Sequence, residues 1–227
     1  ERHGLDSFEA LWALQLFAVD EPNTASRGGW STVYRLDLDG TGYYLKRQSN
    51  YLTRSLHRPL GEPTLAREFR NTCRYQRLGI PAMRSAFYAE RRIGGERRAV
   101  LLTRALDGWR DLDSYLPNWS QLAAVQRHAI ASACGVLARC VHGQGQVHGC
   151  FYPKHIFLQP SGDGFVARAL GVGLACVGAE HRALRAVRVG DEGREAAFDA
   201  FAQKLGFLVI IQVAQLEQFI QNVLPLM

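Results

Sequence analysis

The feature that most constrains the fold is a change in residue pattern near Asp107. Before this point, β-branched and aromatic residues alternate with polar ones in short segments separated by glycine turns, as in antiparallel strands. After it, apolar residues recur mainly at steps of three and four, as in helices. We therefore expect an α+β protein with two lobes. Residues 1–106 would form a β-sheet lobe with one main helix, and residues 107–227 a mostly helical lobe.

In the first half, glycine turns separate the predicted strands. Within Ser26–Leu36 a glycine turn leads into a strand, and further strands are expected over Tyr43–Lys46, Met83–Glu90 and Arg97–Arg104. A short helix is expected over Asp6–Phe17. The main helix ends at Gly79 and presents an apolar face of Leu65, Phe69, Cys73 and Leu78. Residues 47–59 are expected to form a basic connector that carries Arg47, Arg54, His57 and Arg58.

In the second half, Ser120 is the expected N-cap of a helix that reaches His142. The buried side of this helix is expected to carry Leu122, Val125, Ala129, Ala133, Val136, Leu137 and Cys140. Two short strands, Ile156–Leu158 and Phe165–Leu170, should follow, and a last helix should begin near Arg194.

Composition narrows the class of protein. With 47% hydrophobic and 21% charged residues, the chain cannot be a disordered tail or a fibre. Its five cysteines contain no CxxC pair, which excludes a disulfide framework and a zinc knuckle and favours a cytoplasmic protein. The longest apolar run, Phe207–Ile211, is about a quarter of the ~20 residues that span a bilayer, so any membrane association is expected to be peripheral. Because the sequence begins at Glu1 rather than Met, we expect that its natural beginning is missing.

The net charge of +6, from 27 Lys and Arg against 21 Asp and Glu, favours an anionic partner. Phosphate, nucleic acid and acidic glycolipid all meet this requirement. Nucleic acid ranks last, because no stacking motif or groove-reading helix accompanies the basic residues.

The order of several motifs points to phosphate chemistry. A glycine turn at Gly28 and Gly29, followed by Ser31, precedes Lys46 on the third strand and Glu68 on the next helix. Phosphotransferases use glycines to bring backbone amides close to phosphates, a strand lysine to hold them, and a helix glutamate to orient the lysine. Taken alone, Lys46 also fits a solvated strand lysine and Glu68 an ordinary helix-surface glutamate.

Four runs carry a resemblance to a known family. They are Arg27–Tyr34, Tyr43–Gln48, Arg67–Asn71 and His148–Phe157, the last reading His-Gly-Cys-Phe-Tyr-Pro-Lys-His-Ile-Phe. From about Leu11 to Leu170 the sequence resembles the InaA-like branch of the lipopolysaccharide kinases, the bacterial family that includes the Kdo and core-heptose kinases.

The resemblance implies a protein-kinase-like fold of two lobes, with ATP and Mg²⁺ as cosubstrates. It also implies phosphate transfer to a sugar hydroxyl of the lipopolysaccharide core, by a cytoplasmic protein that can lie peripherally on the inner membrane. Arg54, His57 and Arg58 would suit the head group of an acidic glycolipid. A solvated charged loop explains these three residues equally well.

The sequence departs from the family pattern in the loop 148–155 and beyond it. Cys150 stands two residues after His148, where the family resemblance calls for a catalytic aspartate, and Gly171 stands where it calls for the metal-binding aspartate. His155 occupies the position of a second metal ligand, although a histidine hydrogen-bonded within the loop is the more ordinary role. His148 fits a structural role that braces the loop. A thiol is a poor general base for a hydroxyl group.

Two hypotheses follow from these departures. In the first, the chain is a sugar kinase that uses Lys46, Glu68 and an unrecognised metal arrangement, with Cys150 and His148 in its catalytic loop. In the second, it is a pseudokinase that acts as a protein partner or regulator in envelope assembly or stress response. ATP and Mg²⁺ are required only by the first.

Overall fold

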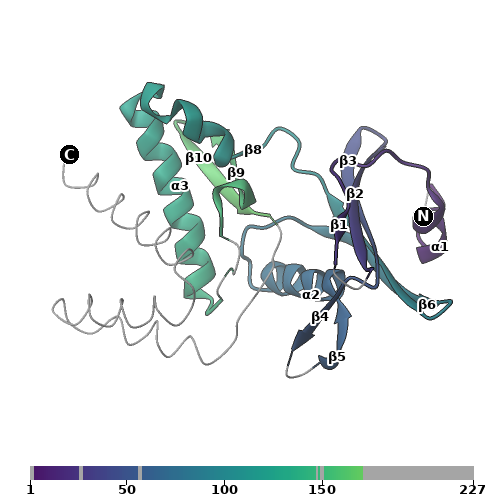
Figure 1. The fold of residues 1–227 in the computed structure, drawn as a ribbon. Coiled ribbons are helices and arrows are strands. Elements are labelled where there is room, and N and C mark those ends of the chain that lie inside the picture. Colours follow the sequence, from purple (N-terminus) through teal and green to yellow (C-terminus); the bar gives the residue numbers. More distant parts are fainter. Residues whose placement is uncertain (1–2, 26–27, 56–57, 147, 149–150, 171–227) are drawn as a thin grey trace. The chain divides into compact units, whose positions relative to one another are not determined.

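The computed structural model of the protein describes residues 3–25, 28–55, 58–146, 148 and 151–170 (Figure 1). The chain divides into two compact units. The first comprises Glu1–Arg77 and Ala82–Asp107, and the second comprises Leu78–Pro81 and Gly108–Met227. The helix predicted from about Arg194 lies outside the described residues.

The first unit is built on a five-stranded antiparallel sheet, and all four predicted strands are confirmed within it. Its order is β1 (Asn23–Thr24), β2 (Trp30–Leu38), β3 (Thr41–Ser49), β7 (Glu96–Arg104) and β6 (Ser85–Ile93). The β2–β3 turn places Asp39 and Gly40 at φ values of 49° and 71°. Positive φ at both central residues gives the turn the twist that matches paired strands, and glycine reaches it without strain.

Alternation along β3 and β7 gives the sheet two apolar faces. On one face Leu45, Val100 and Leu102 form a core with Phe8 and Leu11 of helix α1 (Phe8–Ala13). On the other, Ala99 and Leu101 pack with Leu65 of helix α2 (Thr64–Arg77). Because side chains alternate along a strand, Lys46 projects to the α2 face while its neighbours project to the α1 face.

The helix α1 is shorter than the sequence predicted. It begins after Ser7, whose hydroxyl accepts a hydrogen bond from the Ala10 amide at 3.1 Å, and it ends at Ala13. Leu14 and Leu16 pack against the same core from the non-helical segment that follows α1. The spacing of these apolar residues therefore predicted their burial correctly, but the helix that it predicted for them is wrong.

The predicted basic connector is wrong in two respects. Residues within it form strand β4 (Leu52–Ser55), which pairs with β5 (Arg58–Pro63) as a two-stranded antiparallel sheet. Arg47 belongs to β3 and is only 7% exposed. It donates hydrogen bonds to the carbonyl oxygens of Leu11 and Leu14 at 3.0 and 2.8 Å, so its charge is satisfied inside the unit.

The second unit contains a three-stranded antiparallel sheet in the order β10 (Gly164–Ala169), β9 (Ile156–Ser161), β8 (Arg110–Asp111). Helix α3 (Ala124–Gly143) packs mainly on β10. Two 3₁₀ segments, η1 (Asp113–Gln121) and η2 (Pro153–His155), complete its described part. No helix among the described residues is both long enough and apolar enough to cross a membrane.

The predicted start and buried face of α3 need correction. Ser120 lies in η1, the backbone is extended at Leu122, and the N-cap Ala123 makes no side-chain capping bond. Val125 and Val136, expected inside, are 72% and 56% exposed. The helix starts later than predicted, and its buried face carries Ile130, Ala131, Ala133, Cys134, Leu137 and Val141.

Candidate functional site

The first unit brings Lys46 and Glu68 together. The Nζ atom of Lys46 on β3 lies 2.6 Å from the Oε1 atom of Glu68 on α2. Their side chains are 23% and 15% exposed, so the ion pair is partly buried but still reached by solvent. A lysine ammonium has three N–H groups, and it can therefore hold Glu68 with one and a phosphate oxygen with another.

Gln48 holds helix α2 in the register that this pair requires. Its Oε1 atom accepts hydrogen bonds from the Thr64 hydroxyl at 2.8 Å and from the Leu65 amide at 3.0 Å, and its Nε2 atom donates to the Tyr51 carbonyl at 2.7 Å. The residue is completely buried. Because Gln48 lies two residues from Lys46, both side chains project to the α2 face, and Gln48 fixes the helix start one turn before Glu68.

Sequence reasoning did not assign this role to Gln48. The available signal was its period-two spacing from Lys46, which places an amide side chain on the same face of the strand. That signal is weak, because many strand glutamines face solvent.

The glycine turn precedes β2 and has its own structural cause. Gly28 has a φ of 77°, and its amide donates to the Ala25 carbonyl at 3.0 Å. A Cβ atom on Gly29 would lie 2.3 Å from the carbonyl oxygen of Asn50. Ser31 lies on β2 opposite Gln48 of β3. These contacts explain the two glycines by backbone conformation and close approach; a role in nucleotide binding stays a prediction.

We expect Gly29→Ala to lower the free energy of unfolding by about 1–3 kcal/mol, because the Asn50 backbone must move to admit the methyl group. Urea denaturation followed by circular dichroism measures this change. Gly143→Ala is the matched control: nothing lies within 4 Å of a Cβ there, so stability should be unchanged or slightly higher. Equal stability of wild type and Gly29→Ala would contradict the close approach.

In the second unit, His148 is buried, with 3% of its surface exposed. The pKa of His148 is lowered to about 4, chiefly by burial; the charge of His155 acts in the same direction, and backbone hydrogen bonding at His148 and Leu170 opposes the shift. The ring lies edge-on to Phe151, with centroids 5.7 Å apart. A neutral, enclosed imidazole of this kind fits the bracing role considered for it.

The stability of the protein should fall as the pH drops from 6.5 to 4. Because the folded pKa of His148, about 4, lies below its ordinary value of 6.5, the unfolded chain binds the proton more readily in this window. The full difference corresponds to about 3 kcal/mol. Thermal melts at pH 7 and pH 4.5 should show a smaller pH effect in His148→Gln than in wild type, whereas the exposed His3→Gln control should behave as wild type. An unchanged pH effect in His148→Gln would contradict the assignment.

His155 ends the 3₁₀ segment η2, and its carbonyl accepts a hydrogen bond from the Leu170 amide at 2.8 Å. It therefore lies beside Leu170, at the end of β10. Cys150 and Gly171 themselves lie outside the described residues. Within the part of the chain that is described, no three His, Cys, Asp or Glu side chains gather to hold a metal ion.

The described residues thus suit the phosphates of ATP better than they suit Mg²⁺. Lys46, oriented by Glu68, has the charge and the spare N–H donors that a phosphate requires. For Mg²⁺, which prefers oxygen ligands, His155 is the predicted ligand that the structure describes, and no cluster of three potential ligands forms among the described residues.

Comparisons with known proteins identify the family. The model of the lipopolysaccharide kinase (Kdo/WaaP) family matches residues 9–170. Protein InaA of Escherichia coli (strain K12) is 30% identical over 164 residues, which cover 70% of this chain and 74% of InaA. Among solved structures, WaaP in complex with acyl carrier protein is similar with a TM-score of 0.55 at 19% identity, over 96% of this chain and 92% of that one.

The structural likeness establishes a kinase-like fold, and the matched segment contains Lys46, Glu68, His148 and His155. The resemblance predicted from the four sequence runs is confirmed. This chain belongs to the lipopolysaccharide kinase (Kdo/WaaP) family.

Proposed function

We propose that this protein binds ATP through Lys46 and Glu68 and acts on lipopolysaccharide by transferring phosphate to a hydroxyl group of a core sugar. The observation that carries the proposal is the 2.6 Å contact between Lys46 and Glu68, formed by the third strand and the next helix of a kinase-like unit. Membership of the lipopolysaccharide kinase family supports the substrate class.

Each residue has a definite task in this proposal. Lys46 holds the α- and β-phosphates, Glu68 keeps its ammonium group in place, and Gln48 fixes the helix that carries Glu68. Mg²⁺-bound ATP would supply the phosphoryl group, and the metal ion would neutralise the negative charge of the phosphate oxygens. Arg54 and Arg58 are exposed and suit the acidic head group of a glycolipid on the cytoplasmic side of the inner membrane.

Cys150 favours a second candidate function. A thiol in place of the aspartate gives up the carboxylate that accepts the proton of the sugar hydroxyl, at a cost of about 10²–10⁴ in rate. With Gly171 at the metal-ligand position as well, the chain would act as a pseudokinase, a partner or regulator in envelope assembly or stress response. The solved WaaP relative forms a complex with acyl carrier protein, which supports a protein partner.

A nucleotide-binding assay followed by a turnover assay separates these functions. At 100 times its Kd, ATP should stabilise the protein by ~2.7 kcal/mol, measured as a thermal shift with and without Mg²⁺. Lipopolysaccharide-dependent release of ADP would then identify the kinase. Stabilisation without turnover would identify the pseudokinase, and the absence of any shift would refute ATP binding in both.

A further inference from the structure

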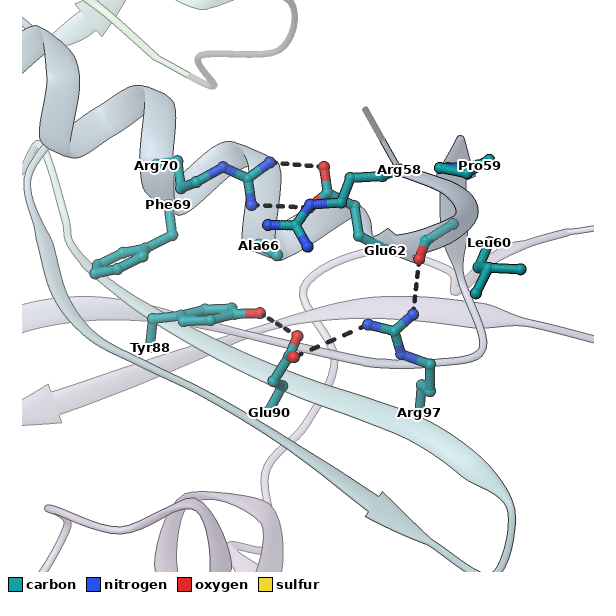
Figure 2. Close-up of a pocket in the computed structure, with 11 residues that line it drawn as sticks. Arg58, Pro59, Leu60, Glu62, Ala66, Phe69, Arg70, Tyr88, Glu90 and Arg97 are labelled. Carbon is teal, nitrogen blue, oxygen red and sulfur yellow. Dashed lines mark hydrogen bonds and ion pairs between the residues drawn. The ribbon is translucent and has the colours of Figure 1, made fainter. Parts of the chain in front are cut away.

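A cavity of about 590 Å³ lies in the first unit beside helix α2 (Figure 2). It is lined by the β5 strand, by α2, by β6 and by the start of β7, and neither Lys46 nor Glu68 belongs to its lining. Its volume falls within the range of pockets that hold small organic ligands. The cavity is therefore a site distinct from the Lys46–Glu68 pair.

One part of the lining is apolar and aromatic. The rings of Phe69 and Tyr88 are stacked, with centroids 4.9 Å apart and planes 14° from parallel. Ala66 adds a small side chain from α2, and Leu60, at 89% exposed, adds an apolar side chain at the β5 side. An apolar group that entered the cavity would cover this surface.

The other part of the lining is charged, and Figure 2 shows two sets of polar contacts. Arg70 donates to both carboxylate oxygens of Glu62, at 2.6 and 2.8 Å. The Tyr88 hydroxyl donates to Glu90 at 2.8 Å, and Arg97 donates to the Gly61 carbonyl at 2.7 Å and lies 3.9 Å from Glu90. Both carboxylates are thus engaged by side chains of the lining itself.

The charges of the lining do not balance. Three arginines, Arg58, Arg70 and Arg97, face two glutamates, Glu62 and Glu90, which leaves one positive charge in excess. The hydrogen bonds from Arg70 hold the pKa of Glu62 below its usual value, and the charges of Arg58 and Arg67 act in the same direction. Glu62 therefore stays ionised near neutral pH. With both glutamates negative, the lining keeps one excess positive charge, which belongs to a guanidinium group. Arg58 is exposed at the edge of the cavity.

We propose that this cavity binds an organic anion in which a phosphate or carboxylate group is joined to an apolar group. The anionic group would meet Arg58, because a guanidinium offers paired N–H donors that match phosphate and carboxylate oxygens. The apolar group would cover the Phe69–Tyr88 stack. This site is separate from the proposed ATP site, because neither Lys46 nor Glu68 lines it. It shares Arg58 with the proposed contact to the glycolipid head group.

Isothermal titration calorimetry with phenyl phosphate, in the absence of nucleotide, tests the proposal. We expect binding by wild type and a loss of about tenfold or more in affinity in Arg58→Gln. Arg77→Gln removes the same charge from an exposed position at the end of α2, outside the cavity, and should bind as wild type does. Lys46→Ala should also bind as wild type does. Thermal melts confirm that each variant is folded.

Two further probes decide whether both halves of the ligand matter. Inorganic phosphate and benzyl alcohol should each bind at least tenfold more weakly than phenyl phosphate. Equal binding of either one, unchanged binding by Arg58→Gln, loss of binding in Lys46→Ala, or no binding of phenyl phosphate would overturn the proposal.

Displacement of phenyl phosphate by lipid vesicles shows whether the bound anion is a lipid or a soluble molecule. If phosphatidylcholine vesicles that contain phosphatidic acid displace phenyl phosphate, while pure phosphatidylcholine vesicles do not, the site takes a lipid phosphate. If neither displaces it, the site takes a soluble ester. Both results support the proposed chemistry.

Discussion

Replacing Lys46 with alanine is expected to remove most of the stabilisation of the protein by ATP. Lys46 is the cation that the proposed site directs at the phosphates, and losing its charged hydrogen bonds should cost about 3 kcal/mol of binding energy, or 100-fold in Kd. At an ATP concentration 100 times the wild-type Kd, stabilisation would then fall from ~2.7 to ~0.4 kcal/mol. Thermal shift measured over a range of ATP concentrations reports both values.

Two variants act as controls for this prediction. Lys154→Ala removes an exposed lysine of η2 and should keep the full ATP shift. Glu68→Gln keeps an oxygen near Lys46 but removes the negative charge, and its ATP shift should lie between those of wild type and Lys46→Ala. A wild-type shift in Lys46→Ala would show that the phosphates are held elsewhere.

Gln48→Leu is expected to be the most destabilising of the substitutions considered. Leucine has nearly the same size as glutamine but offers no acceptor, so the Leu65 amide and the Thr64 hydroxyl lose their partner, as does the Tyr51 carbonyl. Buried polar groups left without partners cost ~1–3 kcal/mol each, and we expect a loss of about 3 kcal/mol in all after part of the site relaxes. In a chain of this length the Tm should fall by about 6–12 °C.

Gln76→Leu is the matched control, because Gln76 is exposed on the same helix. Its Tm should change by less than about 2 °C, as is usual for surface substitutions. Equal melting temperatures for Gln48→Leu and Gln76→Leu would contradict the structural role of Gln48. If the role is correct, Gln48→Leu should also weaken ATP binding, since α2 no longer begins at a fixed point on β3.

The strands around glycine turns were predictable because their signals are local. The turn at Asp39 and Gly40 requires positive φ, and this requirement is visible in the residue types themselves. The strand β3 was expected to end near Lys46 but continues to Ser49. Charged residues after Lys46 suggested a solvated connector, whereas in the fold Arg47 is buried against carbonyl groups of a segment more than thirty residues away. No local pattern contains such a partner.

The same distinction applies to α3. The spacing of its apolar residues predicted a helix, and Ala133 and Leu137 are buried as expected. Val125 and Val136 are exposed, because the face that is buried depends on where the helix begins and on which strand it packs against. The spacing of apolar residues predicts neither the start of the helix nor the strand against which it packs.

By itself the sequence determined the antiparallel strands, the main helix, the family, and the pairing of Lys46 with Glu68, since these depend on turn chemistry, on alternation, and on motifs in a given order. The tertiary structure alone decided that Gln48 anchors α2, that Arg47 is internal, and that three arginines surround a cavity with only two glutamates. The physical reason is that hydrogen bonds and charge balance depend on which groups lie close together in space. Residues far apart in the sequence can form these contacts, and no local sequence pattern predicts them.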